Sequence, residues 1–500
     1  MTGIPEEFIQ SNLQGISFIA PEIILTLAIL ILLCVGIILP HWRHRLVFTI
    51  LAVAGLAGSL FPLWKLPQPT PGLTYLSKLF VWDWLTFYSK PFFALVGIFT
   101  ILLAQISGEI DNSEYSECTV LVLAVTMAML LLVASTDLLM IFLAFETMGI
   151  LSYLLVGIRA RDERSGEAAL KYVLYGAFTS GTMLFGFSLL FGLAGSTDLA
   201  EISQQVALAS QHPQDRLLLI VAILFFMAGL LFKTASFPFH FWCPDVYEGA
   251  PTPITAFLSV GPKAAGFVLF IRLFYPLFAL GPETGAYQAI SGLEWPSILA
   301  LVSAITMNLG NLTAIHQKNL KRLLAYSSIA HAGYLLMGIV ALSDLGLRSV
   351  VFYLVVYLFM NLGAFGVVTM VAAAGGSEEI DSYRGLGVRA PYVCVAMAIF
   401  LFSLIGLPPF AGFVGKVYLF AAVISKKIYW LAAVAALNTV ISLYYYLRIV
   451  KAMFLDKPTD EAVQIQVPLS SQALLLALLI PTLGLGIYWQ PLARVVGGMF

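Results

Sequence analysis

Long apolar runs constrain this chain more than any other feature of its sequence. Runs of about 20 apolar residues, each long enough to cross the hydrocarbon core of a bilayer as a helix, follow one another along the chain. Charged residues make up only 11% of the sequence, against about 25% in a typical soluble protein. The formal net charge of −1 provides no basic face for nucleic acid. The sequence therefore predicts an all-α polytopic membrane protein.

The apolar runs predict about fourteen transmembrane helices, joined by loops too short to hold a soluble domain. The expected spans lie near residues 17–40, 45–64, 80–107, 118–135, 137–158, 167–194, 216–235, 254–279, 297–314, 322–342, 347–374, 391–424, 428–454 and 468–490. No basic segment precedes the first run and no small-residue cleavage site follows it, so we expect this run to be retained as a span.

Basic residues in the loops predict the orientation, because Lys and Arg of short loops stay in the cytoplasm. Thirteen lie in the odd-numbered loops, and eight lie in the even-numbered loops and the C-terminus. The odd-numbered loops, including the one that contains Arg161, are therefore expected on the cytoplasmic side. Both termini are then expected on the opposite side.

A short internal echo predicts a repeat. The segment "SYLLVGI" at 152–158 returns as "GYLLMGI" at 333–339, and "VTM" at 125–127 returns as "ITM" at 305–307. The offset between the two heptapeptides covers five predicted spans, an odd number, so the second copy is inverted in the membrane. We therefore predict two inverted five-helix repeats, an arrangement typical of ion-coupled transporters.

The repeat divides the single membrane domain, residues 1–500, into four parts. These are helices 1–3 within 1–115, the first repeat at 118–279 with helices 4–8, the second repeat at 297–454 with helices 9–13, and helix 14 at 468–490.

Prolines predict that helices 7 and 12 are discontinuous. Pro238 follows helix 7 in "FKTASFPFHFW", and Pro408 and Pro409 interrupt helix 12 in "LPPFAGF". Proline removes a backbone donor and leaves carbonyls of the preceding turn without their helical partner. In a bilayer such backbone survives only against protein or a hydrated cavity. Both breaks therefore predict a polar interior.

Ionisable residues inside or near the spans are the candidate site residues. They are Glu146, Lys233, Lys263 and Lys416. A charge at the bilayer centre costs about 2.5 kcal/mol or more, unless a lysine near a helix end extends its amine to the headgroups. Lys416 lies eight residues from the end of its predicted span, about 12 Å along a helix, and is too deep for this. Lys263 lies nearer the start of its span, so for this residue an amine that extends to the headgroups stays an open alternative.

A buried lysine suits proton transfer. Burial disfavours its charged form, and a nearby carboxylate restores that form. Glu146 and Lys233 are predicted to make such a pair, and Lys171 at the start of helix 6 modulates the pair or anchors the helix at the interface. His331, inside helix 10, is either a packing residue or a relay that gains and loses a proton near neutral pH.

Several other chemistries are not supported by the sequence. "GFVGKV" resembles the end of a phosphate-binding loop, but Phe410 and Val417 stand where that loop needs Gly and Ser or Thr. No metal-binding cluster and no nucleophile elbow occur. The isolated cysteines are expected to be small core residues; they are Cys34, Cys118, Cys243 and Cys394. We expect no bond chemistry, metal or cofactor site on this chain.

Three segments carry a resemblance to a known family. They are "FHFWCPDVYEGAPTPITAFLSVGPKAAGF" at 239–267, "LKRLLAYSSIAHAGYLLMG" at 320–338 and "GLPPFAGFVGK" at 406–416. With them, essentially the whole chain resembles subunit N of the bacterial proton-translocating NADH:quinone oxidoreductases, respiratory complex I. The resemblance implies an antiporter-like subunit of a bacterial plasma-membrane translocase, with other complex I membrane subunits, including further antiporter-like ones, as partners.

The same resemblance assigns roles to the candidate residues. It matches Glu146 and Lys233 to the ion pair of a first half-channel, Lys263 to a central lysine, His331 to a bridging residue and Lys416 to the lysine of a second half-channel. It places NADH, FMN, iron–sulfur clusters and quinone on other subunits. Two alternatives stay open: a subunit of a multisubunit cation/proton antiporter, and a subunit of a plastoquinone-reducing photosynthetic homologue in a thylakoid membrane.

Overall fold

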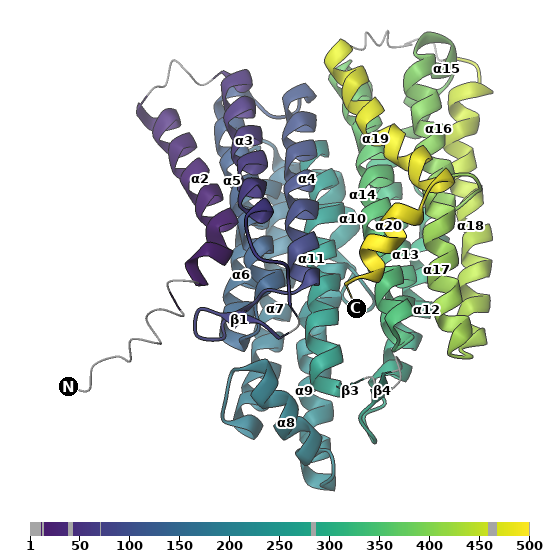
Figure 1. Ribbon diagram of the computed structural model, residues 1–500. Helices are drawn as coiled ribbons and strands as arrows, with labels where there is room; N and C mark the ends of the chain where they lie inside the picture. The colour runs from purple at the N-terminus through teal and green to yellow at the C-terminus, as the bar shows by residue number, and fades with distance from the viewer. Residues whose placement is uncertain are drawn as a thin grey trace.

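The computed structural model describes residues 12, 15–38, 44–70, 72–281, 287–458 and 468–499 and is built almost entirely from helices (Figure 1). The first half contains η1 (Ser17–Ile19), α2 (Ala20–Ile38), α3 (Arg45–Leu60), η3 (Phe61–Trp64), α4 (Trp84–Ile106), α5 (Asn112–Ala134), α6 (Leu138–Val156), α7 (Glu163–Ala194), α8 (Leu199–Ala209), α9 (Pro213–Thr234), α10 (Trp242–Gly249) and α11 (Thr252–Phe278). The second half contains α12 (Trp295–Ala314), α13 (Leu320–Val340), α14 (Asp344–Ala373), η4 (Ile380–Tyr383), α15 (Leu386–Arg389), α16 (Pro391–Ile405), α17 (Ala411–Ser425), α18 (Tyr429–Phe454), α19 (Leu469–Ile487) and α20 (Gln490–Gly497).

Strands occur only as two small antiparallel pairs in loops of the described chain. In the first, β1 (Thr74–Tyr75) pairs with β2 (Phe80–Val81), with Thr74 opposite Val81. In the second, β3 (Ala279–Leu280) pairs with β4 (Gln288–Ala289). Both are too short to form a core.

The helices confirm the predicted membrane spans. Within the described ranges, thirteen helices are long and apolar enough to cross a membrane. The fourteenth span is the predicted discontinuous helix 12, which consists of α16 and α17 on either side of residues 406–410. Helix 7 is also interrupted, because α9 ends at Thr234 and the chain resumes as the short helix α10 at Trp242. The all-α polytopic fold is therefore as predicted.

Side-chain caps explain where many of the helices begin. The Asp137 carboxylate accepts the Leu139 and Met140 N–H groups at the start of α6, and the Asn319 side chain accepts the Arg322 N–H at the start of α13. These N–H groups have no partner inside their helix, and a capping oxygen supplies one.

Some helices differ from the sequence prediction. The acidic segment after Glu109 was expected to be loop as far as helix 4 at 118, but α5 already begins at Asn112. Its polar first turns extend beyond the apolar run that defined the prediction. The helix α8 was not predicted, because its 11 residues are too short and too polar to read as a span.

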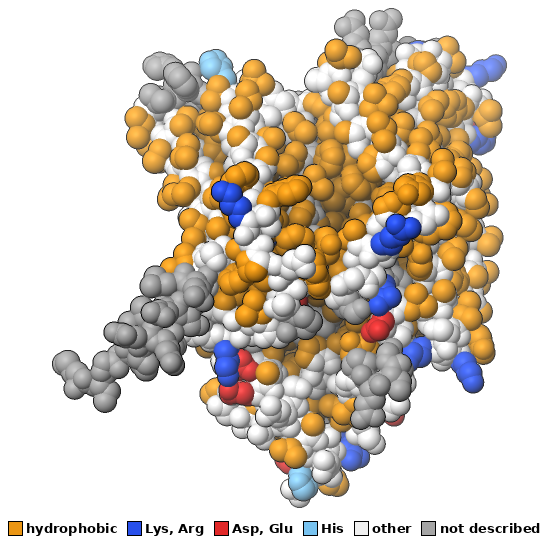
Figure 2. Space-filling model, in the orientation of Figure 1, with side chains coloured by type: hydrophobic (Ala, Val, Ile, Leu, Met, Phe, Trp, Pro, Cys, Tyr) orange, Lys and Arg blue, Asp and Glu red, His pale blue; other side chains and the backbone are white. Residues whose placement is uncertain are grey.

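The most buried helices lie at the centre of the bundle. Every residue of the most apolar window of α11 is buried, and α13 and α14 are nearly as enclosed. Exposed apolar side chains instead occur on outer helices such as α2, α6, α7 and α18. Figure 2 shows one face on which hydrophobic side chains cover most of the helices. This apolar exterior and enclosed centre are what a lipid solvent requires.

Two buried ion pairs fasten the N-terminal helices to the centre. Arg272 on α11 donates to both carboxylate oxygens of Asp83, the residue before α4. Burial alone would raise the pKa of the Asp83 carboxyl, but the charge and hydrogen bonds of Arg272 hold that pKa below its ordinary value. Two turns further along α4, Lys90 pairs with Glu22 of α2, with 3.0 Å between the nitrogen and Oε1. Both pairs involve α4.

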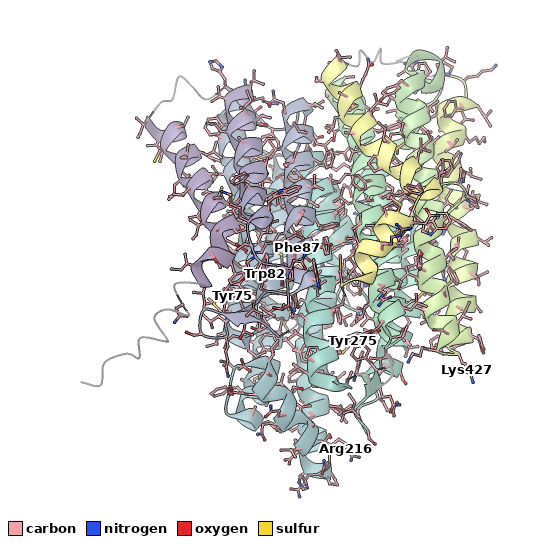
Figure 3. The ribbon with its side chains drawn as sticks, in the orientation of Figure 1. Tyr75, Trp82, Phe87, Arg216, Tyr275 and Lys427 are labelled. Carbon is pink, nitrogen blue, oxygen red and sulfur yellow. The ribbon has the colours of Figure 1, made fainter. Side chains whose placement is uncertain are left out.

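The loops divide between the two ends of the bundle. Arg216 and Lys427, both from even-numbered loops, lie toward the same end in Figure 3. The division of the chain into two inverted five-helix repeats, and the side on which each end faces, stay predictions from the sequence.

A topology experiment tests these predictions. We expect reporters inserted at Arg161, in an odd-numbered loop, and at Lys427, in an even-numbered loop, to report opposite sides of the membrane. The measurement is the activity of paired alkaline phosphatase and fluorescent-protein fusions. Reporters on the same side would contradict both the charge-based orientation and the inverted repeat.

Candidate functional site

Lys416 lies directly beside the break in helix 12. The α16 helix ends at Ile405, and Gly406 takes a left-handed conformation with φ 88°. The Lys416 amine, buried on α17, donates to the Ile405 carbonyl at 2.8 Å and lies 4.5 Å from the centre of the Tyr334 ring. The amine therefore satisfies a carbonyl that the broken helix leaves free.

Glycine at 406 is required by two features of this geometry. Its positive φ is costly for any residue with a side chain. A Cβ at this position would also lie 2.9 Å from Cδ of Lys416. The break and the lysine stem therefore occupy space that only glycine provides.

Lys233 occupies the last turn of α9, just before the break in helix 7. Its side chain is 1% exposed, and among the described residues its amine has no hydrogen-bond partner. An aromatic ring lies beside it, since the amine is 4.9 Å from the centre of the Phe145 ring on α6. A buried amine without a hydrogen-bond acceptor is a costly arrangement that points to function rather than to stability.

Glu146, next to Phe145 on α6, is half-buried. Within the described residues no ion pair joins it to Lys233. The Lys233 amine instead faces the backbone of Gly149, one turn further along α6. Lys233 of α9 therefore faces α6, the helix that carries Glu146, but the two side chains do not form an ion pair.

Lys263 lies in the middle of α11 and is also buried. Its amine donates to the Ser328 hydroxyl on α13 and lies 3.8 Å from the Cys243 sulfur on α10. The stem of Lys233 passes beside Gly266, one turn along α11, where an added Cβ would lie 3.4 Å from its Cγ. Lys263 thus stands between the break in helix 7 and the second half of the bundle.

His331 on α13 is held by two tyrosines. Its Nδ1 lies 2.7 Å from the Tyr353 hydroxyl on α14, and its Nε2 lies 3.4 Å from the Tyr446 hydroxyl on α18. The Tyr446 hydroxyl also bonds to Ser327. Both ring nitrogens are therefore in contact with hydroxyls that either donate or accept, so the imidazole can exchange tautomers without losing its partners.

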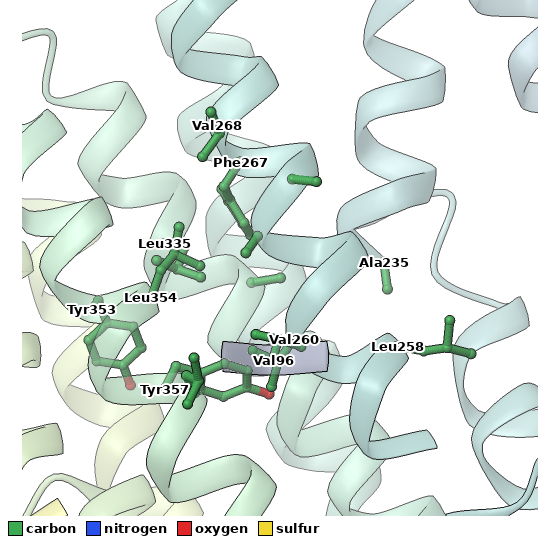
Figure 4. Close-up of a cluster of buried hydrophobic side chains, with 14 of the residues drawn as sticks. Val96, Ala235, Leu258, Val260, Phe267, Val268, Leu335, Tyr353, Leu354 and Tyr357 are labelled. Atoms are coloured by element: carbon green, nitrogen blue, oxygen red, sulfur yellow. The ribbon is translucent and has the colours of Figure 1, made fainter. Parts of the chain in front are cut away.

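Apolar packing surrounds this polar chain. Tyr353 and Tyr357 lie among Phe267, Leu335 and Leu354, as Figure 4 shows. The Tyr353 ring lies against Gly415, the residue before Lys416, where a Cβ would lie 2.5 Å from Cδ2 of the ring. Tyr353 therefore spans the distance between His331 and the helix that carries Lys416.

Lys171 lies apart from this interior. It is half-exposed, in the third turn of α7, and pairs with Glu167 and Asp245, in each case at 2.8 Å. Asp245 also pairs with Arg322 of α13 at 2.7 Å. The predicted modulator thus belongs to an ion-pair cluster at the end of the bundle, where it connects α7 with α10 and α13.

Two tyrosines were missed by the sequence analysis, although the sequence contains their signal. The echo that predicts the repeat aligns Tyr153 with Tyr334. The Tyr334 ring lies under the Lys416 amine, and the Tyr153 hydroxyl lies beside Gly149, as the Lys233 amine does. Each copy of the echo therefore places a tyrosine next to the lysine of one helix break.

The arrangement brings together buried amines, hydroxyls and an imidazole, groups whose chemistry allows them to hold a proton. Within the described ranges no group of three or more His, Cys, Asp or Glu residues could bind a metal ion. The class of protein that this fold and site define is a polytopic membrane protein of antiporter-like architecture, with two interrupted helices and buried amines at the breaks.

Similarity to known proteins identifies the family within this class. A family model described as "NADH:quinone oxidoreductase/Mrp antiporter, TM" matches residues 135–442. NADH-quinone oxidoreductase subunit N of Anaeromyxobacter sp. (strain Fw109-5) is 44% identical over 504 residues, covering 97% of this chain and 96% of that protein. The chain belongs to the NADH-quinone oxidoreductase subunit N family.

Solved structures agree with the fold. A chain of respiratory complex I from Thermus thermophilus superposes with a TM-score of 0.78 at 29% identity, covering 96% of this chain and all of that one. A chain of the Mrp complex from Dietzia sp. DQ12-45-1b superposes with a TM-score of 0.80 at 21% identity, covering 96% of each chain, and shares the fold.

A glycine substitution tests the geometry of the break. We expect Gly406→Ala to lower the thermal unfolding midpoint of the purified assembly, because a left-handed alanine costs roughly 1–2 kcal/mol and its methyl group meets the Lys416 stem. Gly484→Ala on α19 is the matched control, since a Cβ there meets nothing within 4 Å. Equal midpoints for the two variants would show that the break does not need glycine.

Proposed function

We propose that this chain is an antiporter-like, proton-translocating membrane subunit of a bacterial NADH:quinone oxidoreductase, working in the plasma membrane. The observation that carries the proposal is the pair of buried amines at the two helix breaks, Lys233 and Lys416, with Lys263 and His331 placed between them. Membership of the subunit N family supports the same conclusion.

Proton transfer through this interior follows from the chemistry of its groups. A buried amine is stable as a neutral group and takes up a proton when a carboxylate or dipole approaches. The Ile405 carbonyl is such a dipole beside Lys416. A proton that arrives at one amine repels charge on the next, so successive lysines load and release in turn. We infer that the imidazole of His331, which bonds to Tyr353 and Tyr446, links Lys263 with Lys416 in this route.

The redox chemistry is proposed to take place elsewhere in the assembly. NADH, FMN, iron–sulfur clusters and quinone would be bound by other subunits, and this chain would contribute proton movement alone. Its partners are then the other membrane subunits of complex I, among them further antiporter-like subunits. The apolar side chains exposed on α6, α7 and α18 provide surfaces for such neighbours and for lipid.

A second candidate is a subunit of a multisubunit cation/proton antiporter, because the matching family model includes Mrp antiporters. The two functions differ in their energy source. Purification of the chain with its partners separates them: NADH-dependent quinone reduction by the purified assembly supports the first function. Cation-driven proton exchange without that activity supports the second.

Glu146→Gln tests the carboxylate near the first break. We expect NADH-driven formation of a pH gradient to fall severalfold, because the carboxylate that stabilises charge near Lys233 is removed, while Glu146→Asp retains part of the activity. The measurement is acridine-dye quenching in inverted membrane vesicles, with assembly checked by native gel. Normal pumping by assembled Glu146→Gln would leave the carboxylate without a role in transport.

Substitution of Lys416 tests whether its proton moves. We expect Lys416→Ala to lower pumping and quinone reduction together, since a stalled proton step slows the coupled reaction. Lys416→Arg keeps a charge that cannot be released at working pH, so we expect little rescue. Rates of quinone reduction and gradient formation are compared in both variants. Near-normal pumping in Lys416→Arg would mean that a fixed charge is sufficient.

A further inference from the structure

A row of hydroxyl groups runs along the central helix toward Lys263. Thr252, Thr255, Ser259 and Lys263 are spaced by three, four and four residues along α11, which places them on one face of the helix. All four side chains are buried. The row covers twelve residues, a rise of about 16 Å along the helix, from the first residue of α11 to the central lysine.

Within the row, Thr252 Oγ1 has no hydrogen-bond partner among the described residues, whereas the Thr255 hydroxyl donates to the Tyr247 carbonyl at 2.9 Å and the Ser259 hydroxyl donates to the Ala256 carbonyl at 2.6 Å. Buried polar atoms without a protein partner are Thr252 Oγ1, the Tyr247 hydroxyl and Asn361 Oδ1. The Asn361 amide donates to the Ser259 hydroxyl at 2.6 Å, and the Tyr247 ring lies 5.4 Å from the Lys263 amine. Buried polar atoms of this kind are generally satisfied by ordered water. Their positions follow the row from its outer end to Lys263.

A carboxylate stands at the outer end of the row. Glu109, in the loop between α4 and α5, accepts the Thr252 N–H through Oε2 at 2.8 Å. Its other oxygen, Oε1, is buried and has no hydrogen-bond partner among the described residues, although the residue itself is partly exposed. The loop belongs to the odd-numbered set that the sequence predicts on the cytoplasmic side. Glu109 is therefore a partly exposed carboxylate bonded to the backbone of the residue that carries the first hydroxyl of the row.

The charged groups near Glu109 are engaged elsewhere. Arg45 of α3 donates to carbonyls of the same loop, at Ser107 and Ile110. Lys321 of α13 pairs with Glu378 at 2.8 Å. Within the described residues, no cation lies within ion-pair distance of the Glu109 carboxylate. Among the described residues, the Glu109 carboxylate therefore has no ion pair that a proton would have to displace.

We propose that Glu109 collects protons on the loop side of the membrane and that the hydroxyl row of Thr252, Thr255 and Ser259, bridged by water, conducts them to Lys263. Each hydroxyl accepts a proton from one bridging water and releases one to the next, so no net charge remains on the row; Thr255 and Ser259 first turn their O–H groups away from the Tyr247 and Ala256 carbonyls. The Lys263 amine becomes an ammonium, and the Glu109 carboxyl returns to a carboxylate. This inference rests on the proposed proton-transport function.

A second polar opening lies at the same end of the bundle, with an aromatic pair beside it. A cavity of about 310 Å³ is lined by the ion-paired Lys171, Asp245 and Arg322. Next to it, Tyr172 and Trp242 stack with ring centres 4.4 Å apart and planes 14° from parallel. This aromatic pair lies between the cavity and the end of α9, since the Trp242 indole donates to the Phe232 carbonyl.

The experiment compares variants of the row in the assembled complex. Glu109→Gln removes the collecting group, and Thr252→Val removes the first hydroxyl at nearly constant shape. Thr369→Val is the matched control, because the buried Thr369 hydroxyl on α14 bonds to Phe365 of its own helix. Quinone reduction and pH-gradient formation are measured in inverted vesicles, with assembly checked by native gel. We expect severalfold losses in Glu109→Gln and Thr252→Val and none in Thr369→Val.

Chemical rescue separates proton collection from a structural role. Formate added to uncoupled vesicles should restore quinone reduction in Glu109→Gln, because a small acid replaces the missing proton carrier. Assembled Glu109→Gln that loses activity without rescue would overturn the proposal and leave Glu109 as a cap of α11. Normal activity in Glu109→Gln and Thr252→Val, with Lys416→Ala impaired, would overturn this route alone. Normal activity in Lys416→Ala as well would contradict the proposed function itself.

Discussion

The constraint on which this structure depends is the absence of water in the bilayer core. Every backbone group and every charge in the spanning region must find its partner inside the protein. At the break in helix 12 both requirements meet in one hydrogen bond, from the Lys416 amine to the Ile405 carbonyl. The lysine amine supplies a donor to a carbonyl that the helix break leaves free, and that carbonyl supplies an acceptor to the buried amine. Under the proposed function, proton transport and the fold use the same few atoms.

The polar interior depends on the central helices. The three most enclosed helices provide Lys263 on α11, His331 on α13 and Tyr353 on α14. Lys263 bonds to a serine of α13, and His331 bonds to Tyr353. The N-terminal helices are fastened to this centre through Asp83 and Arg272. Outer helices cover it with apolar surface. The result is a chain of titratable groups enclosed by protein, as a proton route in a membrane must be.

Much of this could be predicted from sequence because the bilayer imposes strong rules. Span length fixes apolar runs, so all fourteen spans were found, and prolines located both breaks. The sequence predicts less about contacts between segments that are distant along the chain. The sequence could not show that Lys233 faces an aromatic ring and glycine backbone rather than Glu146 itself, nor that Lys171 belongs to a surface ion-pair cluster. Polar helices such as α8 were missed because the rule for spans does not describe them.

The central claim is that buried lysines change their protonation during turnover. Redox-triggered infrared difference spectroscopy of the assembled complex, with ¹⁵N-labelled lysine, measures this directly. We predict ammonium bands that shift with the label and are reduced in Lys416→Met. A difference spectrum without any lysine contribution, or one that Lys416→Met leaves unchanged, would contradict the claim.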